Sequence, residues 1–235
     1  MLLATMRPAD ALHVLEEAWA LRDAVDDPRL CFACALLICH CFKRLERWSD
    51  AEPWQDIAIA MARQQGWRAQ VFELQTEAAG AFLEEGDHLA RQGRLEQAQD
   101  RWRAAASTFD ALVSDPCFGE LRPYNRVVFL CDHASSLSRV GRGAEALPLV
   151  ERCFELSAGF VDHDLRIALH LAKANVLRDL QRLDEATAEA SLGASLAQQH
   201  KVPRHLCEAF TLLSTLAERQ GDLAAALAHL RAFIR

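Results

Sequence analysis

Four cysteines near the start of the chain are the residues whose types and spacing come nearest to a chemical site. Cys31 and Cys34 are three residues apart and Cys41 follows, so a helix would carry these thiols near one face, with Cys39 turned away and His40 close by. Thiolates and imidazole bind zinc, and paired thiols form redox disulfides. A structural zinc site usually needs a second cysteine pair, and none follows. We therefore interpret the cluster as small packing residues, with a metal or redox site as the alternative.

Sequence patterns that carry catalysis are absent. The chain contains no glycine-rich phosphate loop, no His-Glu-x-x-His, no Gly-x-Ser-x-Gly and no calcium-binding loop. His133 and His170 have apolar neighbours at helical spacing, which is typical of histidines satisfied within a core. We expect no catalytic residues, no metal ligands and no cofactor. The chain alone is then not an enzyme, although a longer protein could carry a C-terminal enzymatic output domain.

Composition and charge exclude several classes of partner. Hydrophobic residues make up 51% of the chain, charged residues 25%, and 33 acidic against 26 basic side chains give a formal charge of -7. Both signs are scattered, so no basic surface is expected to bind nucleic acid. The apolar stretch Leu30–Phe42 is too short to span a bilayer, and the N-terminus lacks an export signal. We expect a cytoplasmic protein without membrane insertion.

A turn signature recurs five times and indicates how the chain is organised. It consists of a turn residue, any residue, a hydrophobic or small residue, two further residues and alanine. The copies are Glu46–Ala51, Gly93–Ala98, Gly141–Ala146, Gln181–Ala186 and Gly221–Ala226. The turn positions lie 47, 48, 40 and 40 residues apart, and a period of this length is typical of stacked helical hairpins.

These repeats predict an all-α protein with a single repeat domain over residues 1–235. We expect a right-handed superhelical solenoid of antiparallel helix hairpins with about ten helices. A leading helix is expected over 8–25. The expected hairpins span 29–66, 70–112, 124–157, 165–199 and 204–235.

The segment Ala79–Asp110 resembles a tetratricopeptide repeat (TPR). The positions that carry this resemblance are Phe82, Gly86, Leu89, Ala98, Trp102 and Ala105. Small residues allow two helices to cross closely while large ones fill the space beside the crossing. The same register places Cys39, Ala134, Ala174 and Ser214 at the small position of the other copies. The proline usual at the end of such a repeat is missing, and Glu46 replaces the turn glycine of the first copy.

The resemblance implies that the first helix of each hairpin lines a concave groove in which a protein or peptide partner binds. The polar groove positions in this register are His40, Lys43, Arg44, Asp87, Arg91, Ser135, Arg139, Asn175, Arg178, Thr215 and Arg219. Arginines beside an asparagine resemble the way some TPR domains bind the terminal carboxylate of a peptide. An arginine just before a turn is also the ordinary solvated partner of a helix C-terminus, and both interpretations stay open.

The last hairpin carries a narrower resemblance. Residues Leu212–Arg231 are similar to the final repeat of input regions that precede GGDEF diguanylate cyclase domains in bacterial signalling proteins. The closing helix is apolar along one broad face, at Leu223, Ala226, Leu227, Leu230, Phe233 and Ile234. This face favours either continuation of the chain in its native context or a homodimer through the C-terminal helix. The alternative is that the face packs on the partner helix of its own hairpin.

Three functions are compatible with these features. The first is a non-catalytic protein-protein interaction or sensory module, acting as the N-terminal input region of a bacterial signalling protein such as a diguanylate cyclase. The second is a free-standing TPR adaptor that binds a partner peptide in its groove. The third is a small-molecule or metal sensor. Scaffold residues are shared among unrelated roles, so the sequence does not choose between them.

Overall fold

The computed structural model describes residues 7–25 and 27–234, and these residues are all-helical. Twelve α-helices and one 3-10 helix occur in this part of the chain, and no strand does. The helices are α1 (Pro8–Ala20), η2 (Arg22–Ala24), α2 (Pro28–Arg44), α3 (Trp48–Gln64), α4 (Arg68–Arg91), α5 (Leu95–Leu112), α6 (Pro116–Glu120), α7 (Pro123–Arg139), α8 (Gly143–Ser157), α9 (His163–Asp179), α10 (Leu183–Gln199), α11 (Pro203–Arg219) and α12 (Leu223–Ile234). The all-α prediction is confirmed, with twelve α-helices in the described ranges where about ten helices were expected.

Two short elements differ from expectation. The leading helix expected over 8–25 ends as an α-helix at Ala20, and η2 follows it. Between the hairpins expected over 70–112 and 124–157 lies α6, where the backbone N–H of Cys117 donates to Asp115 Oδ1 at 2.8 Å and so satisfies a free helical amide. No helix within the described ranges is long and apolar enough to cross a membrane.

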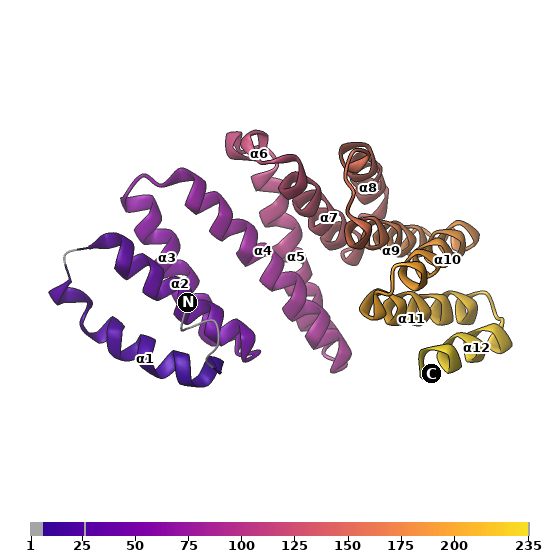
Figure 1. Ribbon diagram of the computed structural model, residues 1–235, viewed down its shortest axis with the longest axis horizontal. Coiled ribbons are helices and arrows are strands. Elements are labelled where there is room, and N and C mark those ends of the chain that lie inside the picture. Colours follow the sequence, from indigo (N-terminus) through magenta and orange to yellow (C-terminus); the bar gives the residue numbers. More distant parts are fainter. Residues whose placement is uncertain (1–6, 26, 235) are drawn as a thin grey trace. The chain divides into compact units, whose positions relative to one another are not determined.

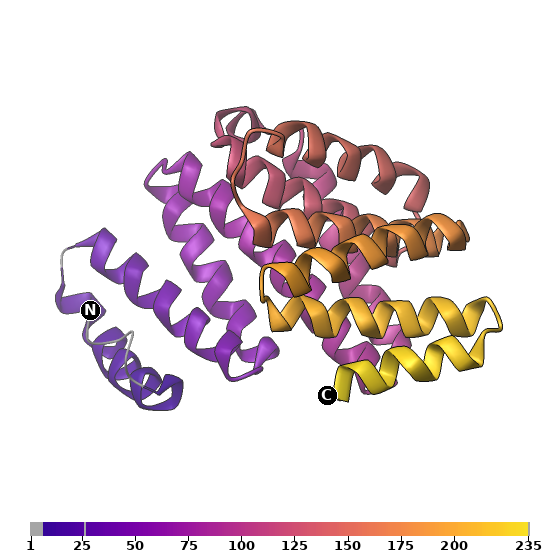
Figure 2. The same ribbon diagram turned by 45° about the vertical axis from the view of Figure 1, so that its right-hand side comes forward.

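Contacts group the chain into two compact units, unit 1 (Met1–Gly119) and unit 2 (Glu120–Arg235). In unit 1, α1 packs against α2, and the antiparallel hairpins α2–α3 and α4–α5 meet through α3 and α4 (Figure 1). Unit 2 contains the hairpins α7–α8, α9–α10 and α11–α12 (Figure 2). Each unit is therefore built from adjacent antiparallel helices, and the single domain expected over 1–235 stays a prediction.

The five turn positions expected from the sequence share a left-handed backbone. Their φ angles are 56° at Glu46, 78° at Gly93, 81° at Gly141, 61° at Gln181 and 81° at Gly221. After each of them the next backbone N–H bonds a carbonyl five residues back, as when Arg94 N donates to the Leu89 carbonyl at 3.0 Å. This pattern satisfies carbonyls that the end of a helix leaves free. The turns therefore stop each first helix at the predicted place.

Small residues allow the two helices of a hairpin to cross closely. The five residues predicted at this position are all buried: Cys39, Gly86, Ala134, Ala174 and Ser214. Gly86 is the tightest, because a Cβ there would lie 2.4 Å from Trp102 Nε1. The Trp102 indole fills the space beside the α4–α5 crossing and donates to Asp87 Oδ1 at 3.0 Å.

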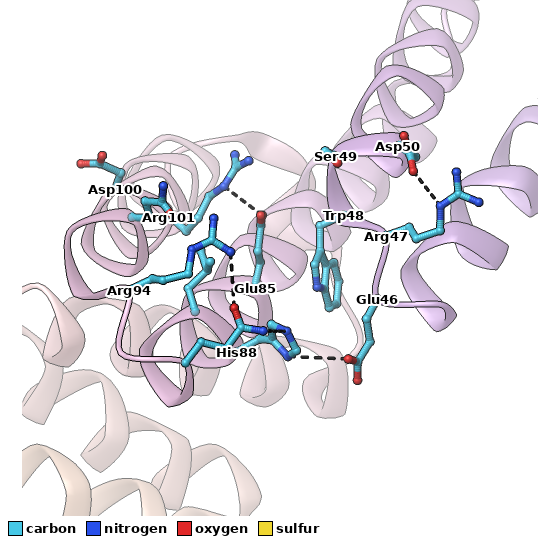
Figure 3. A pocket seen from close by; sticks show the side chains of 13 residues that line it. Glu46, Arg47, Trp48, Ser49, Asp50, Glu85, His88, Arg94, Asp100 and Arg101 are labelled. Carbon is cyan, nitrogen blue, oxygen red and sulfur yellow. Dashed lines mark hydrogen bonds and ion pairs between the residues drawn. The ribbon is translucent and has the colours of Figure 1, made fainter.

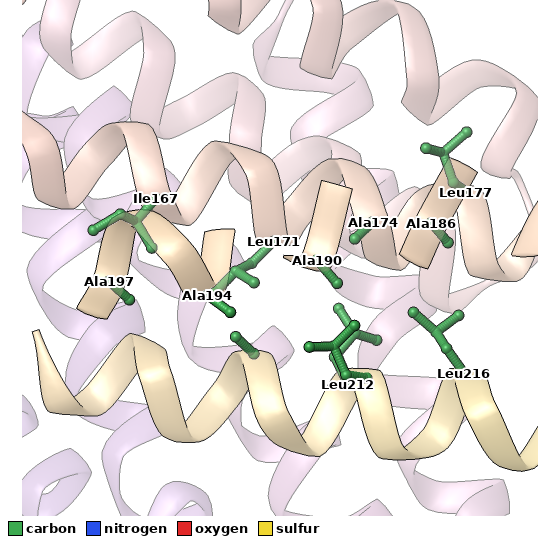
Figure 4. Close-up of a cluster of buried hydrophobic side chains, with 12 residues drawn as sticks. Ile167, Leu171, Ala174, Leu177, Ala186, Ala190, Ala194, Ala197, Leu212 and Leu216 are labelled. Atoms are coloured by element: carbon green, nitrogen blue, oxygen red, sulfur yellow. The ribbon is translucent and has the colours of Figure 1, made fainter. Parts of the chain in front are cut away.

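In unit 2 the core continues from hairpin to hairpin. The α10 helix presents four alanines to its neighbours, Ala186, Ala190, Ala194 and Ala197. Leucines of α9 and α11 fill the space that these alanines leave, among them Leu171, Leu177, Leu212 and Leu216 (Figure 4). All three helices are 17 residues long, and the buried seam runs from Ile167 to Leu177 on α9, from Ala186 to Ala197 on α10 and from Ala209 to Leu216 on α11.

In unit 1 the apolar cluster that joins α2 and α3 to α4 reaches only the first turns of α4. Phe32 and Trp67 meet edge to face at 5.4 Å, and Ala58 and Leu74 complete a cluster between α2, α3 and the first turns of α4. Because α4 has 24 residues and α3 has 17, α4 extends about 10 Å beyond the start of α3. The end of α4 therefore lacks the cover of α3 and faces polar residues of the α2–α3 turn.

Candidate functional site

The first helices of the three hairpins of unit 2 pack side by side. The α9 helix contacts both α7 and α11. Ser138 Oγ donates to Asp179 Oδ2 at 2.6 Å between α7 and α9, and Arg219 NH1 donates to the Arg178 carbonyl at 3.5 Å between α9 and α11. These three helices form one layer, which is the arrangement needed for their side chains to share a surface.

Six of the predicted groove residues lie on this layer. They are Ser135, Arg139, Asn175, Arg178, Thr215 and Arg219, and all are partly or fully exposed. Asn175 Nδ2 donates to the Leu171 carbonyl at 3.0 Å, and Arg178 Nε bonds Asp179 Oδ1 at 2.9 Å. The structure thus brings these residues onto neighbouring helices, and their role in binding stays a prediction.

In unit 1, His40 and Lys43 belong to a polar network that joins α2, α3 and α4. The Gln55 side chain, 5% exposed, accepts at Oε1 from Lys43 Nζ (2.6 Å) and Cys39 Sγ (3.2 Å), and donates to a carbonyl of α4 at 2.7 Å. His40 Nε2 lies 3.1 Å from Glu77 Oε2, and this hydrogen bond lowers the pKa of the Glu77 carboxyl. Lys43 is thus bonded to a buried glutamine and His40 to an exposed carboxylate, and the role of both in binding stays a prediction.

The other three predicted residues of unit 1 differ in their surroundings. Asp87 accepts the Trp102 indole bond at the α4–α5 crossing. Arg91 is exposed, and its Nε donates to the Asp87 carbonyl one turn back at 3.3 Å. Arg44 is also exposed. Some of the groove residues predicted in unit 1 are therefore engaged in contacts between helices.

The cysteines differ in burial: Cys39, Cys41 and Cys153 are buried, Cys207 is exposed, and the other four are partly buried. Burial raises the pKa of the Cys34, Cys39 and Cys41 thiols, and it raises the pKa of Cys153 to about 12. A thiol with a raised pKa stays protonated at neutral pH and is a poor nucleophile and metal ligand. Within the described ranges, no group of three or more His, Cys, Asp or Glu residues could hold a metal ion.

A cavity that the sequence analysis missed lies in unit 1, between the α2–α3 turn, the end of α4 and the start of α5 (Figure 3). Its volume is about 690 Å³, and most of the residues that line it are charged or polar. A second cavity of about 370 Å³ shares Trp48, Glu85 and Arg101 with it. Volumes of this size are typical of sites for small ligands or for side chains of a partner.

Arg101 connects three helices at the border between the two cavities. Its NH1 lies 2.6 Å from Glu52 Oε1 of α3, and its Nε lies 2.9 Å from Glu85 Oε2 of α4. Burial raises the pKa of the Glu85 carboxyl even though Arg101 acts in the opposite direction. Glu85 is therefore an acidic group whose charged form is disfavoured relative to water.

A chain of hydrogen bonds crosses the cavity mouth. Arg94 NH1 donates to Gln92 Oε1 at 3.3 Å, and the Gln92 amide nitrogen lies 2.7 Å from His88 Nε2. On the other side of the ring, His88 Nδ1 lies 3.6 Å from Glu46 Oε2. The α4–α5 turn is thus tied to the α2–α3 turn by polar contacts.

One sequence signal could have pointed to this cavity. The residue after the turn is arginine in four hairpins, and in three of them it pairs with an acid three residues later. These pairs are Arg47–Asp50, Arg142–Glu145 and Arg182–Glu185, at 2.6 to 2.7 Å. In the α4–α5 hairpin, Gln97 stands where the acid would be. Arg94 therefore lacks the internal carboxylate that its counterparts have.

Comparison with solved structures supports a TPR-like repeat fold. The chain is similar to the crystal structure of nearly identical TPR-like repeats assigned to a kinesin light chain of Podosopora anserina, with 15% identity, a TM-score of 0.58 and coverage of 83% of this chain and 89% of that one. The C-terminal part of a TPR repeat-containing protein from Cytophaga hutchinsonii also matches, with 12% identity over 99% of this chain and 92% of that one, but with a TM-score of only 0.35. No family model and no curated protein matches the sequence. The likeness concerns the fold alone.

Proposed function

We propose that this chain is a non-catalytic scaffold that binds a partner protein through a peptide segment laid across α7, α9 and α11. The observation that carries the proposal is the layer of adjacent first helices with polar, partly exposed side chains. Helical repeat proteins use such extended surfaces for binding, and a TPR-like fold is compatible with that role.

The chemistry of the surface favours a peptide that carries a carboxylate. Arg139 and Arg219 lie near the C-terminal ends of α7 and α11, and Asn175 lies between them on α9. A guanidinium group binds a carboxylate through two parallel hydrogen bonds, and an asparagine amide can donate a further one. The terminal carboxylate of a peptide is the simplest ligand with this pattern of acceptors.

The test uses a library of fluorescent peptides with free C-terminal carboxylates and the same peptides amidated. We expect the unmodified chain to bind a subset of the free peptides, and the Arg139→Ala/Arg219→Ala variant to bind them about tenfold more weakly or worse. The Arg166→Ala/Arg204→Ala variant is the matched control, because it removes two exposed arginines from α9 and α11 near their other ends. Equal anisotropy changes in both variants would contradict the proposed surface.

For the biological context, the input region of a bacterial signalling protein and the free-standing adaptor both agree with a protein-binding role. The resemblance of Leu212–Arg231 to the repeat before a GGDEF domain supports the first. Leu223 (73%) and Leu227 (48%) are exposed on α12, which is compatible with a covering segment or a second copy in either context. The other apolar positions expected on this face, Leu230, Phe233 and Ile234, have side chains outside the described part of the structure.

The sequence of the native gene beyond codon 235 separates the two contexts. A helical segment followed by an output domain supports the input region, and an immediate stop codon supports the adaptor. The homodimer through α12 is tested by light scattering of the unmodified chain and of a Leu223→Glu/Leu227→Glu variant. A dimer that the variant converts to a monomer supports the α12 interface, and a monomer at every concentration excludes it.

A further inference from the structure

The acidic groups around the 690 Å³ cavity of unit 1 already have partners. Glu85 is bonded to Arg101, and Asp50 is bonded to Arg47. Asp100 pairs with Arg103 at 3.0 Å outside the cavity, and Glu46 faces His88. The acceptor oxygens of the walls are therefore largely occupied, and a cation entering the cavity would have to displace an existing ion pair.

The groups left over are hydrogen-bond donors. The Trp48 indole nitrogen is buried and has no hydrogen-bond partner among the described residues. Trp48 opens α3, and its ring lies in the cavity between Glu85 and Glu46 (Figure 3). A buried N–H without an acceptor is unfavourable unless water or a ligand supplies one. The cavity is thus short of acceptors at this point.

Arg94 is the second donor. It precedes α5 and borders the cavity, and its side chain does not cap the helix. Its bond to Gln92 uses one of the five N–H groups of the guanidinium. In the α7–α8 and α9–α10 hairpins the equivalent arginine holds a carboxylate through two bonds of 2.6 to 2.7 Å. In the α4–α5 hairpin residue 97 is glutamine, so Arg94 has no carboxylate three residues later to pair with beside the cavity.

We propose that this cavity is a ligand site, and that Arg94 and the Trp48 indole N–H together bind a carboxylate group of the ligand. The ligand carboxylate takes the place that Asp50, Glu145 and Glu185 occupy in the other hairpins. The group is carried either by a small organic acid or by an acidic side chain of a bound peptide. The site shares no residue with the surface proposed on unit 2, so each can fail without the other.

Three substitutions probe the site without touching the core. Arg94→Gln removes the exposed cation, and Trp48→Phe removes the indole N–H while it keeps an aromatic ring. Gln97→Glu restores the internal carboxylate, so the variant is expected to pair with Arg94 and to exclude the ligand. Arg182→Gln is the matched control, since it removes the equivalent arginine of α10, far along the chain from the cavity.

The experiment follows the indole N–H resonances of the full chain by NMR, with Trp48 assigned by its absence in Trp48→Phe. One titration uses citrate, with sodium chloride at matched ionic strength as the blank. The other uses a short oligoglutamate peptide, acetylated and amidated at its ends, with oligoglutamine as the blank. We expect a saturable downfield shift of the Trp48 resonance, and a Kd raised about tenfold or more by Arg94→Gln and by Gln97→Glu but not by Arg182→Gln.

The titrations also identify the source of the carboxylate. A response to citrate assigns the site to a free organic acid, and a response to oligoglutamate alone assigns it to a partner peptide. The proposal is overturned if neither probe gives a saturable shift, or if Arg94→Gln and Gln97→Glu bind as tightly as the unmodified chain. Tighter binding of inorganic phosphate than of either probe would contradict the carboxylate class.

Discussion

Unit 1 and unit 2 are built from the same kind of hairpin but differ in how consecutive hairpins meet. In unit 2 the turns repeat every 40 residues, and helices of 17 residues pack along a continuous seam of alanines and leucines. In unit 1 the spacing is 47 residues, and the longer α4 extends beyond α3. His88 near the end of α4 faces Glu46 of the preceding hairpin, and Arg101 of α5 bridges Glu85 of α4 to Glu52 of α3.

This difference shows how a change of helix length can create a cavity in a repeat protein. A hairpin buries its apolar face only where the neighbouring helices overlap, because stacking supplies the cover. Extra turns on one helix lack the cover of the preceding hairpin, so the side chains that face that hairpin must be polar or must border a cavity. Here the extra turns of α4 carry Glu85, His88 and Arg91, and two cavities lie beside them.

The largest expected effect breaks the seam of unit 2. Leu171 is 1% exposed and packs beside Gly193 of α10. Leu171→Ala removes a buried side chain, and we expect the free energy of unfolding to fall by about 2–5 kcal/mol, measured by urea unfolding with far-UV circular dichroism. The control is Leu192→Ala, since Leu192 is 46% exposed on α10, and its change should stay within about 0.5 kcal/mol.

The close helix crossings of the two units should differ in how well they tolerate an added methyl group. Gly86→Ala places a Cβ 2.4 Å from the rigid Trp102 ring, and we expect it to destabilise unit 1 by about 1–3 kcal/mol. Gly193→Ala places a Cβ 2.9 Å from the end of the Leu171 side chain, which can rotate, so we expect a smaller effect. Urea unfolding of both variants makes the comparison. An equal or larger loss for Gly193→Ala would contradict this account of the crossings.

Two partly buried carboxylates, Glu189 and Glu85, are expected to change the stability of their units with pH in opposite directions. Burial raises the pKa of Glu189, but hydrogen bonds from Lys173 (2.6 Å) and His170 (2.7 Å) outweigh it, so the net pKa is lowered. Stabilisation by ionised Glu189 is present above the unfolded value of 4.5 and is lost as pH falls through the folded pKa. Glu189→Gln should therefore destabilise unit 2 by about 1–2 kcal/mol at neutral pH, and the difference should shrink at acid pH.

For Glu85 the sign is reversed. Its folded pKa is raised, so the stability of unit 1 falls as pH rises through the range between the unfolded and folded values. Glu85→Gln should leave stability unchanged or raise it at neutral pH. Unfolding curves of both variants at about pH 7 and about pH 4 test the contrast, and a loss of stability for Glu85→Gln at neutral pH would show that its pair with Arg101 is favourable.

The smallest expected effect concerns the turns without glycine. Gln181 and Glu46 have φ angles of 61° and 56°, which are strained for residues with a Cβ. Gln181→Gly should stabilise unit 2 by about 0.5–1 kcal/mol, because relief of strain exceeds the added entropy of the unfolded chain. Glu46→Gly also loses the contact with His88, so we expect a smaller gain in thermal unfolding. A larger gain at Glu46 would show that this contact contributes little.

The sequence predicts the local features of the fold well. Glycine and the alanine five residues later mark the turns because a left-handed backbone and a close crossing each restrict residue type locally. Asp162 is a local feature of the same kind: its Oδ1 accepts from Leu165 N at 2.9 Å and caps α9, a role for which aspartate is a preferred residue. His170 was expected to be a satisfied core histidine, and it is buried against Glu189.

The cavity could not be predicted in the same way. Trp48 and Arg94 belong to different hairpins, and they border one cavity only because α4 is longer than α3. The groove prediction also depends on contacts between neighbouring helices. It assigned His40 and Lys43 to a binding surface, but a buried glutamine of the neighbouring helix engages Lys43 in a network that no spacing along one helix reveals.

Hydrogen exchange measured by mass spectrometry tests the central comparison most directly. We expect amides of residues 84–91, at the end of α4, to exchange faster than those of residues 172–179, at the end of α9, because α9 is covered by α7, α8, α10 and α11. Both segments are the final turns of a first helix and are chemically comparable. Equal protection of the two segments would contradict the conclusion that the longer α4 leaves its last turns uncovered.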